Sequence, residues 1–329
     1  MPPLLQKFEE SPPPVSNQLK ALVVAGLCFG ALLTALGMLA YWWPALDIVN
    51  NGLPFLATGC LALLGLAFAT RARRLIGAAA LLLAVCFAML LTGLPGAAPG
   101  AEAGSERFLR VATFNLSGRN GDVDRVVNFL DKIEADAVVL EEVRPYHGDL
   151  LAKLSALYPH RVGEQHGLVI LSKHAILADG RLDREGQPPR MSLIIRWARL
   201  DVNGTPVELA GVHLARPFYP ELQQADILDL TKFVQSRSAP LILAGDFNMA
   251  PWTFKLKRFI QATSLGRFNT FQPTWPMRWL SLPLLPLIPI DNVFASTHFT
   301  SLGTTMGSRL GSDHRPVIAD IALSKSTAD

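Results

Sequence analysis

Five short segments in the C-terminal two thirds of the chain carry most of its chemical information. They are residues 113–115, 140–143, 245–248, 290–292 and 312–316, and each places an Asn, Glu, Asp or His at the end of a short apolar run. A parallel or mixed sheet brings strand ends together, however far apart they lie in the sequence. Oxygen ligands and one imidazole at a shared edge are what a hard divalent cation and a phosphate ester require.

Residues 244–248 hold the most compact of these sets. Asp246 and Asn248 follow the apolar run 241–243. Side chains two positions apart point the same way from an extended strand end, and Gly245 lets the backbone turn there. The carboxylate supplies a charged oxygen, and the amide can donate to a phosphate or hold a water. The alternative is an Asx-rich turn that only ends the strand.

Glu141 and Glu142 close another apolar strand, residues 137–143. Adjacent residues face opposite sides of a strand, so only one of the two can reach a shared edge. We expect Glu142 to reach this edge and Glu141 to point away from it. A solvent-exposed strand end is the alternative for this pair taken alone.

His314 lies just before a strand expected at residues 317–323. An imidazole near carboxylates can act as a base, an acid or a phosphate contact at neutral pH. Five other histidines lack such neighbours and receive no role: His147, His160, His166, His174 and His298.

Short strands and a few helices must position these residues. Strands are expected at 108–116, 137–143, 168–172, 193–200, 207–214, 241–247, 290–295 and 317–323. Helices are expected at 124–135 with Asp122 as the N-cap, at 221–235 and at 252–263. Many strands, few helices and short links favour an α+β sandwich over a regular βαβ arrangement.

The first hundred residues have a different composition. Residues 21–43, 53–70 and 75–94 are uncharged apolar runs of spanning length, and the first ends in aromatic residues as a membrane-interface belt does. Three successive runs disfavour a buried hairpin of a soluble domain or a cleaved signal peptide. Residues 1–20 are expected to be a disordered cytoplasmic tail, 21–94 a three-helix transmembrane region, and 95–106 a linker to one domain at 107–323, which is expected to fold alone.

Basic residues predict the orientation of these spans. Arg71, Arg73 and Arg74 lie between the second and third runs, so this loop is expected in the cytoplasm. The loop between the first two runs has Asp47 and no Lys or Arg, so it is expected outside. Three spans then place everything after residue 94 outside the cytoplasm, in the periplasm or beyond.

All three cysteines, Cys28, Cys60 and Cys86, fall within the apolar runs. The domain after the linker therefore has no disulfide and no thiolate metal site. The net charge of +3 is too weak to indicate a nucleic-acid partner.

Taken together, the five segments resemble the endonuclease/exonuclease/phosphatase superfamily, which includes pancreatic deoxyribonuclease, base-excision-type endonucleases, neutral sphingomyelinases and inositol polyphosphate phosphatases. The resemblance covers residues 107–323 and implies two packed β-sheets flanked by helices, with the active site at one edge. Residues 273–275 and 288–291 look like those of a bacterial membrane-attached branch.

The resemblance also implies roles for individual residues. Metal ligands are expected at Asn115, Glu142 and Asp313, with Mg²⁺ as the cation and Mn²⁺ as the alternative. The residues expected around the phosphate are His213, Asp246, Asn248, Asp291 and His314. Asp291 would orient the imidazole of His314, and either Asp246 or His314 would be the base for the attacking water. Ser117 stands where several endonucleases of the family carry an acidic residue, which weakens the endonuclease interpretation.

The implied function is a membrane-anchored, metal-dependent phosphoesterase whose partners are membrane lipids and a phosphoester substrate: a nucleic acid, a phospholipid or a small phosphodiester. The alternative is an inactive binding or scaffold domain of the same fold, which has no physical reason to keep a costly polar cluster. Residues 279–290 are strongly apolar and rich in proline. They are expected to pack as a loop or to form an apolar lip that touches lipid.

Overall fold

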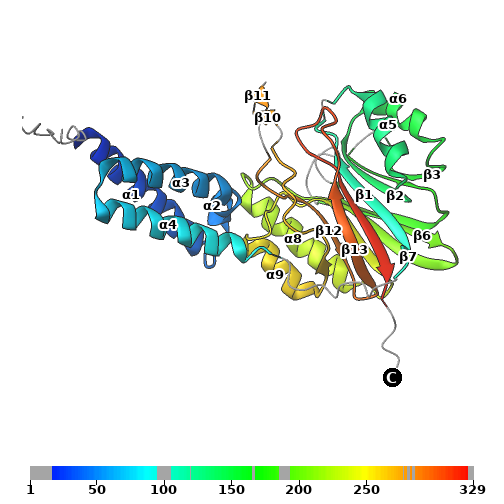
Figure 1. Cartoon of the computed structure of the whole chain (residues 1–329). Coiled ribbons are helices and arrows are strands. Elements are labelled where there is room, and N and C mark those ends of the chain that lie inside the picture. Colours follow the sequence, from blue (N-terminus) through cyan, green and yellow to red (C-terminus); the bar gives the residue numbers. More distant parts are fainter. Residues whose placement is uncertain are drawn as a thin grey trace, which may run out of the picture.

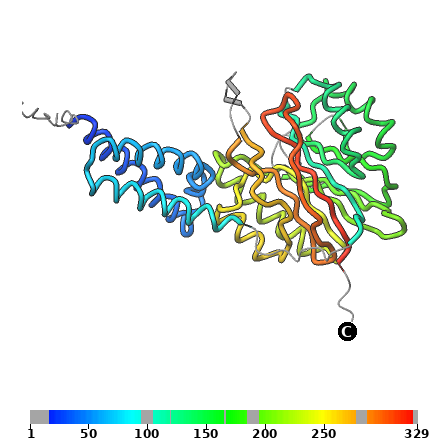
Figure 2. Tube along the Cα trace, in the orientation of Figure 1, coloured from blue at the N-terminus to red at the C-terminus, as the bar shows by residue number. Residues whose placement is uncertain are grey.

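The protein is described by a computed structural model that covers residues 17–94, 105–118, 120–164, 167–184, 193–276, 278–279, 282–283 and 286–324. A group of N-terminal helices extends from one side of a domain built on two β-sheets (Figures 1 and 2). The chain runs from the helices into the sheets, and its C-terminal strand lies second in the order of the first sheet, next to an edge strand.

Each sheet has six described strands. The first sheet has the order β13-β14-β1-β2-β4-β3, with bounds Phe299–Met306, Val317–Leu323, Leu109–Asn115, Ala137–Val143, Gly167–Ser172 and His160–Val162. The second has the order β5-β6-β7-β8-β12-β9, with bounds Ile176–Asp183, Leu193–Val202, Thr205–His213, Leu241–Asp246, Asp291–Ala295 and Gly266–Arg267. All eight predicted strands are present, so the strand pattern of the sequence is confirmed.

The pairing register places the polar strand ends beside one another. Asn115 at the end of β1 pairs with Glu141 of the parallel strand β2. His213 at the end of β7 pairs with Asp246 of the parallel strand β8, and Asp246 pairs with Asp291 of the antiparallel strand β12. The strand ends of both sheets therefore carry their polar side chains to one edge.

Three apolar layers hold this arrangement. Residues such as Val111, Val139, Leu209 and Val293 form a core between the two sheets. Helices α5 (Val123–Ile133) and α6 (Gly148–Leu154), with the 3-10 turn η2 (Pro145–His147), cover one sheet, and α8 (Pro220–Gln235) and α9 (Phe254–Thr263) cover the other (Figure 1). The predicted two-sheet sandwich flanked by helices is confirmed.

Several elements escaped the sequence pattern. Strands β5 and β13 were not predicted, because both carry many polar residues and are partly exposed along their length. The short β3 and α6 were missed as well. Asp122 does occupy the N-cap position of α5, but its side chain makes no capping hydrogen bond, which corrects the expected role. Helix α9 is instead capped by Thr253, whose hydroxyl accepts from the N–H of Leu256.

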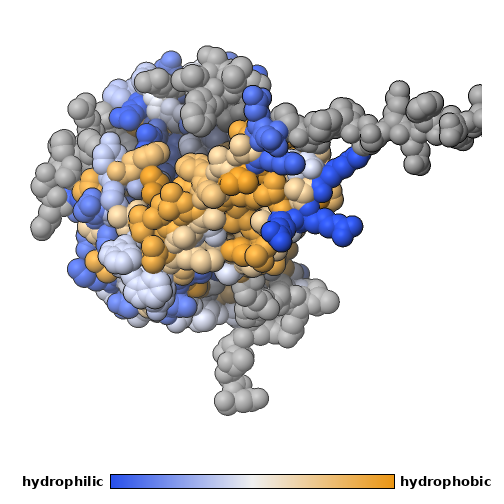
Figure 3. Space-filling model, turned by 90° about the vertical axis from the view of Figure 1, so that its left-hand side faces the viewer, coloured by the Kyte–Doolittle hydropathy of each residue, from blue (hydrophilic) through white to orange (hydrophobic). Residues whose placement is uncertain are grey.

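The three predicted apolar runs form three helices, α1 (Asn17–Leu39), α3 (Leu53–Thr70) and α4 (Arg73–Leu91). Each is long and apolar enough to span a membrane. Large apolar side chains on them are exposed, including Phe29 at 62% and Leu81 at 67%. Figure 3 looks onto the free end of these helices and shows a broad hydrophobic surface there. Helix α1 begins at Asn17, so residues 17–20 of the expected disordered tail are helical. Residues 1–16 lie outside the described residues.

The helices and the sheet domain are in direct contact. Between α1 and α3, the 3-10 turn η1 (Pro44–Leu46) and the short helix α2 (Asp47–Asn51) lie at the end of the helices that meets the domain (Figure 1). An apolar cluster crosses the boundary: Leu53, Ala57, Cys60 and Cys86 with Ala250, Trp252, Ile288 and Ile290. The expected linker therefore does not keep the two regions apart. Residues 95–104 of the expected linker 95–106 lie outside the described residues.

The apolar segment 279–290 is described in part. A two-stranded ladder joins β10 (Arg278–Trp279) to β11 (Leu282–Pro283), and Trp275 bridges Ile288 at its base. Ile288 and Ile290 are buried against the helices, so the base of the segment packs. Residues 280–281 and 284–285, which belong to the expected lipid-touching lip, lie outside the described residues.

Candidate active site at the sheet edge

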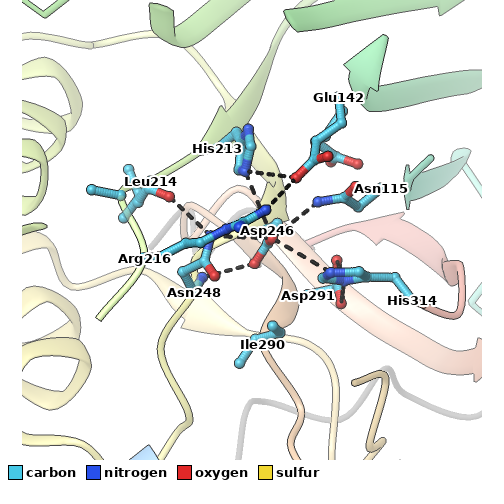
Figure 4. Close-up of polar contacts among 12 residues, drawn as sticks. Asn115, Glu142, His213, Leu214, Arg216, Asp246, Asn248, Ile290, Asp291 and His314 are labelled. Atoms are coloured by element: carbon cyan, nitrogen blue, oxygen red, sulfur yellow. Dashed lines mark hydrogen bonds and ion pairs between the residues drawn. The ribbon is translucent and has the colours of Figure 1, made fainter. Parts of the chain in front are cut away.

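Asp246 lies at the centre of the site and contacts four of the residues predicted from the sequence (Figure 4). Its Oδ2 accepts from Asn115 Nδ2 at 3.1 Å and from Asn248 Nδ2 at 3.2 Å, and its Oδ1 accepts from the Asn248 backbone N–H at 2.8 Å. The Nε2 atoms of His213 and His314 lie 3.8 and 3.9 Å from Oδ2. One buried carboxylate thus joins both sheets at their shared edge.

The backbone around Asp246 explains why glycine and asparagine flank it. Gly245 has φ +151°, and a Cβ there would lie 1.9 Å from the carbonyl oxygen of Val212, so no other residue fits between β7 and β8. Asn248 has φ +51°, a left-handed conformation that Asn tolerates better than most residues. Its Nδ2 also donates to the Leu214 carbonyl at 2.9 Å, which orients the side chain.

His314 is held by a carboxylate on the other ring nitrogen. Its Nδ1 lies 2.9 Å from Oδ2 and 3.2 Å from Oδ1 of Asp291. Ser312 ties this loop to β1, because its hydroxyl donates to the Asn115 carbonyl at 2.7 Å and accepts from the His314 backbone N–H at 3.0 Å. The imidazole is therefore fixed in direction, with Nε2 turned toward Asp246.

The surroundings shift the pKa values of these groups. Burial raises the pKa of Asp246 to about 7, although the charge of His314 acts in the opposite direction. Burial also disfavours a charged His314, but Asp291, Asp246 and Asp313 outweigh it and raise the pKa of His314 to about 10. At neutral pH the imidazole carries its proton, and Asp246 is near the midpoint of its titration.

Glu142 reaches the same edge from β2. It has φ +54° and lies at an irregularity in the pairing of β2 with β4, which turns the carboxylate outward. Glu142 Oε1 accepts from Arg216 at 3.2 Å and lies 3.9 Å from His213 Nε2 (Figure 4). Burial lowers the pKa of His213, so this ring is neutral at neutral pH.

Glu141 does not contact the rim residues that Glu142 reaches, and it lies beneath them. Its side chain is fully buried beneath the edge, where Oε1 accepts from the Thr113 hydroxyl at 2.5 Å. Burial and the nearby Asp291 raise the pKa of Glu141 well above its usual value, which favours the neutral acid. A neutral carboxylic acid has nearly the shape of the Gln that the family resemblance implies at this position.

Among the described residues, one group of His and carboxylate side chains lies close enough together to hold a single cation. Asp246, Asp291 and His314 place ligand atoms within 4.8 Å of one another. A protonated imidazole repels a cation, however, and both ring nitrogens of His314 already face carboxylates. The set expected from the sequence, Asn115, Glu142 and Asp313, offers oxygens from two carboxylates and an amide, which suit Mg²⁺.

The space around Glu142 fits a ligand. Gly118 lies beside it, and a Cβ there would come within 2.9 Å of Glu142 Oε2, so the absence of a side chain leaves this oxygen open. Asp313 Oδ1 is buried and has no hydrogen-bond partner among the described residues, while Trp275 donates to Oδ2 at 3.4 Å. Burial raises the pKa of Asp313, but the His314 charge and hydrogen bonds outweigh it and lower this pKa. Glu142 Oε2 and Asp313 Oδ1 could therefore serve as ligands of a cation.

A cavity of about 1040 Å³ opens beside Glu142 and His213. Six arginines line it: Arg144, Arg161, Arg181, Arg184, Arg196 and Arg216. Four carboxylates line it as well, from Glu142, Glu164, Asp179 and Asp183, so positive charge is in excess. Burial lowers the pKa of Arg196, and its Nε is buried with no hydrogen-bond partner in the described parts of the chain. A cavity of this kind suits an anionic ligand.

Residues 112–314 match the Endonuclease/Exonuclease/phosphatase family, and the chain belongs to this family. All three activities in that name break phosphate ester bonds. No curated protein sequence matches the chain.

Solved structures share the fold. A truncated TDP2 from Caenorhabditis elegans superposes with a TM-score of 0.55 at 17% identity, covering 66% of this chain and 98% of that one. A beta toxin from Staphylococcus aureus gives 0.52 at 14% identity, covering 64% and 99%. An endonuclease/exonuclease/phosphatase from Beutenbergia cavernae gives 0.55 at 22% identity, covering 68% and 74%.

The structure adds site residues that sequence reasoning missed. Arg216 contacts Glu142 from the loop after β7, three positions beyond His213. Gln223 of α8 donates to the Asn248 carbonyl at 3.1 Å. Asn51, from the helical region, donates to the same carbonyl at 3.4 Å. Arg216 could have been found from its spacing to His213, whereas neither amide lies in a recognisable pattern.

Proposed function

We propose that the protein is a membrane-anchored, divalent-metal-dependent phosphoesterase whose catalytic domain acts outside the cytoplasm. The observation that carries this proposal is the position of Asp246, a buried carboxylate with a pKa of about 7 that contacts Asn115, Asn248 and two imidazoles at one sheet edge. A buried polar cluster of this kind costs stability, and shifted pKa values of this kind are typical of functional sites.

Glu142, with Asn115 and Asp313, would hold the cation. Mg²⁺ is the expected ion, with Mn²⁺ as the alternative, because all the available ligand atoms are oxygens. Such a cation supplies charge stabilisation at the phosphoryl oxygens and at the leaving group.

The remaining residues divide the work on water and phosphate. Asp246 is the better candidate for the base, because a pKa near 7 lets it accept a proton at neutral pH, whereas His314 already holds one. The His314 imidazolium, held by Asp291, would donate to a phosphoryl oxygen. Neutral His213 can donate a further hydrogen bond to a non-bridging oxygen. Both N–H groups of the Asn248 amide already donate, to Leu214 and to Asp246, so Asn248 orients the carboxylate instead.

Three apolar helices and their flanking charges support the membrane anchor and its direction. Arg71, Arg73 and Arg74 lie at the end of the helices away from the domain, and Asp47 lies at the end that contacts it. Under the positive-inside rule the domain is then outside. A C-terminal alkaline phosphatase fusion should be active, and activity of a cytoplasmic reporter at the same position would reverse the orientation.

The arginine-lined cavity supports a substrate with a second anionic group beside the scissile phosphate. Its volume is on the scale of small-molecule pockets, which favours a phospholipid headgroup or a small phosphodiester over a nucleic-acid strand. The domain's direct contact with the helices also favours a substrate that resides in the membrane.

A phosphoester panel on the full-length protein in detergent tests the proposal. It should include plasmid DNA, RNA, sphingomyelin, anionic phospholipids and an aryl phosphodiester, each with Mg²⁺, Mn²⁺, Ca²⁺ or EDTA. We expect hydrolysis of a lipid or small phosphodiester that EDTA abolishes. Hydrolysis of DNA or RNA alone would make the protein a nuclease, and no hydrolysis of any ester would favour the scaffold alternative.

A further inference from the structure

A segment of the helical region contacts the backbone of the catalytic loop. Asn51, the last residue of α2, bridges two points on residues 248–250: its Oδ1 accepts from the Ala250 N–H at 2.7 Å, and its Nδ2 donates to the Asn248 carbonyl at 3.4 Å. Asn248 itself contacts Asp246 through its backbone N–H and its side chain. One residue therefore separates Asn51 from the central carboxylate of the site.

The same short helix holds the rest of the loop. Both oxygens of Asp47 accept backbone N–H groups at the start of α9, from Phe254 at 3.1 Å and from Lys255 at 2.8 Å. Trp252 Nε1 donates to the Asn50 carbonyl at 2.6 Å. The first N–H groups of a helix have no acceptor within the helix, so Asp47 supplies the acceptors for these two N–H groups of α9.

These contacts are buried and polar. Asp47, Asn50 and Asn51 are 2%, 1% and 8% exposed, although they lie in a turn between two apolar helices. Buried polar groups stabilise a structure only when they are paired in a defined geometry. Apolar packing alone would join the two regions without fixing their register, whereas five directed hydrogen bonds specify where the loop lies.

Two other elements contact the backbone of the loop at residue 248. Asn248 has a left-handed backbone, and its carbonyl accepts from two amides, Asn51 and Gln223. Gln223 is linked in turn to Lys255, whose Nζ donates to Gln223 Oε1 at 3.0 Å. The Asn248 backbone is thus clamped between α8 on one side and the helical region on the other.

We propose that helix α2, through Asn51 and Asp47, is a positioning element of the catalytic centre. It fixes the loop that carries Asn248 and thereby the direction of the hydrogen bonds to Asp246. The membrane helices then do more than anchor the enzyme, because turnover depends on how they pack against the catalytic domain. This inference rests on the phosphoesterase function proposed above.

The test compares Asn51→Ala with wild type, both as full-length protein in detergent. Thr58→Ala is the matched control, because among the described residues the Thr58 hydroxyl donates to the Pro54 carbonyl of its own helix and to no residue of the catalytic domain. We expect Asn51→Ala to lower kcat about 10-fold with KM within about 2-fold, as for a group that acts through the transition-state geometry. Gln223→Ala should act through the same carbonyl, so the double variant should lose less than the product of the two single effects.

Hydrogen exchange supplies a readout that does not need activity. In wild type the N–H groups of Ala250, Phe254 and Lys255 should exchange slowly, and in Asn51→Ala the Ala250 N–H should exchange faster while the core strands remain protected. Unchanged exchange in Asn51→Ala overturns the inference, as does wild-type kcat or an equal loss in Thr58→Ala. Absence of hydrolysis in wild type with the expected exchange pattern counts against the phosphoesterase function, and against the catalytic half of the inference with it.

Discussion

The floor and the rim of the site are built differently. On the floor, Asp246, Asp291 and His314 have side chains 2%, 1% and 7% exposed, and His314 lies 2.9 Å from Asp291. On the rim, His213, Glu142 and Arg216 are 24%, 13% and 63% exposed, and the nitrogen atoms of His213 and Arg216 lie 3.9 and 3.2 Å from Glu142 Oε1.

The difference separates two tasks. Buried groups in fixed geometry hold shifted pKa values, which is what proton transfer requires. Exposed groups with looser contacts can exchange one partner for another, which suits the entry of a cation and an anionic substrate. Mutations on the floor should therefore change kcat, and those on the rim should change the metal requirement or KM.

The largest effect is expected for Asp246→Asn. The substitution keeps the shape and removes the base, so kcat should fall about 10³-fold, within the range for losing a general base. The melting temperature should be measured alongside, because the substitution turns one oxygen that accepts from N–H groups into an N–H donor. Asp124→Asn, on the exposed surface of α5, is the control for kcat. A loss below about 10-fold would remove Asp246 from the role of base.

Glu142→Gln is expected to lower activity about 10²-fold at a fixed metal concentration, the scale of losing one electrostatic stabiliser. Excess Mg²⁺ should restore part of the loss, since the variant weakens a metal ligand on the accessible rim. A metal titration of activity measures this, with Glu134→Gln at the C-cap of α5 as control. If the metal dependence of the variant equals that of wild type, the cation binds elsewhere.

The pH profile tests the two raised pKa values on the floor. Since the base acts when ionised, kcat/KM should rise about tenfold per pH unit toward the Asp246 pKa of about 7 and fall above the His314 pKa of about 10. Both pKa values are raised above their ordinary values of 3.8 and 6.5. The stability that each group contributes is fully present below its ordinary pKa and is lost as pH rises through its raised pKa. The melting temperature should therefore fall as pH rises through about 7 and again through about 10. A flat profile between pH 5 and 8 would contradict the assignment of Asp246.

Arg216→Gln should have a smaller effect, confined to KM. Exposed ion pairs contribute little to stability, but a rim charge affects the capture of an anionic substrate. We expect KM to rise about 5-fold at low salt and the difference to shrink at high salt, with kcat unchanged. Arg125→Gln, on the exposed surface of α5, is the matched control. If kcat changed more than KM, Arg216 would act in the chemical step as the floor residues do.

The smallest effect is expected for Glu141→Gln. Because burial favours the neutral form of Glu141, its amide counterpart keeps the shape and the acceptor for Thr113. Activity should stay within about 2-fold of wild type, the range for a near-isosteric exchange. Inactivation by Glu141→Gln together with an active Glu142→Gln would reverse the roles of the two neighbours.

Local patterns account for much of the fold. All eight predicted strands are present, because each buries an apolar run that ends in turn residues. The strands that were missed, such as β13, lie at sheet edges, where solvent tolerates the polar residues that hide a strand from a hydrophobicity pattern. The polar side chains at the strand ends were recognisable for the complementary reason, since they interrupt an apolar background.

The sequence by itself determined the three apolar helices, the two-sheet domain and the residue types at its catalytic edge. Only the tertiary structure decided which of them touch: that Asp246 is the hub, that a left-handed Glu142 faces outward while Glu141 is buried, and that Asn51 holds a loop 199 residues further along the chain. The physical reason is that burial and periodicity are properties of neighbours in sequence. A hydrogen bond across the fold depends on a geometry that no local segment contains, and the pKa values of Asp246 and His314 depend on it as well.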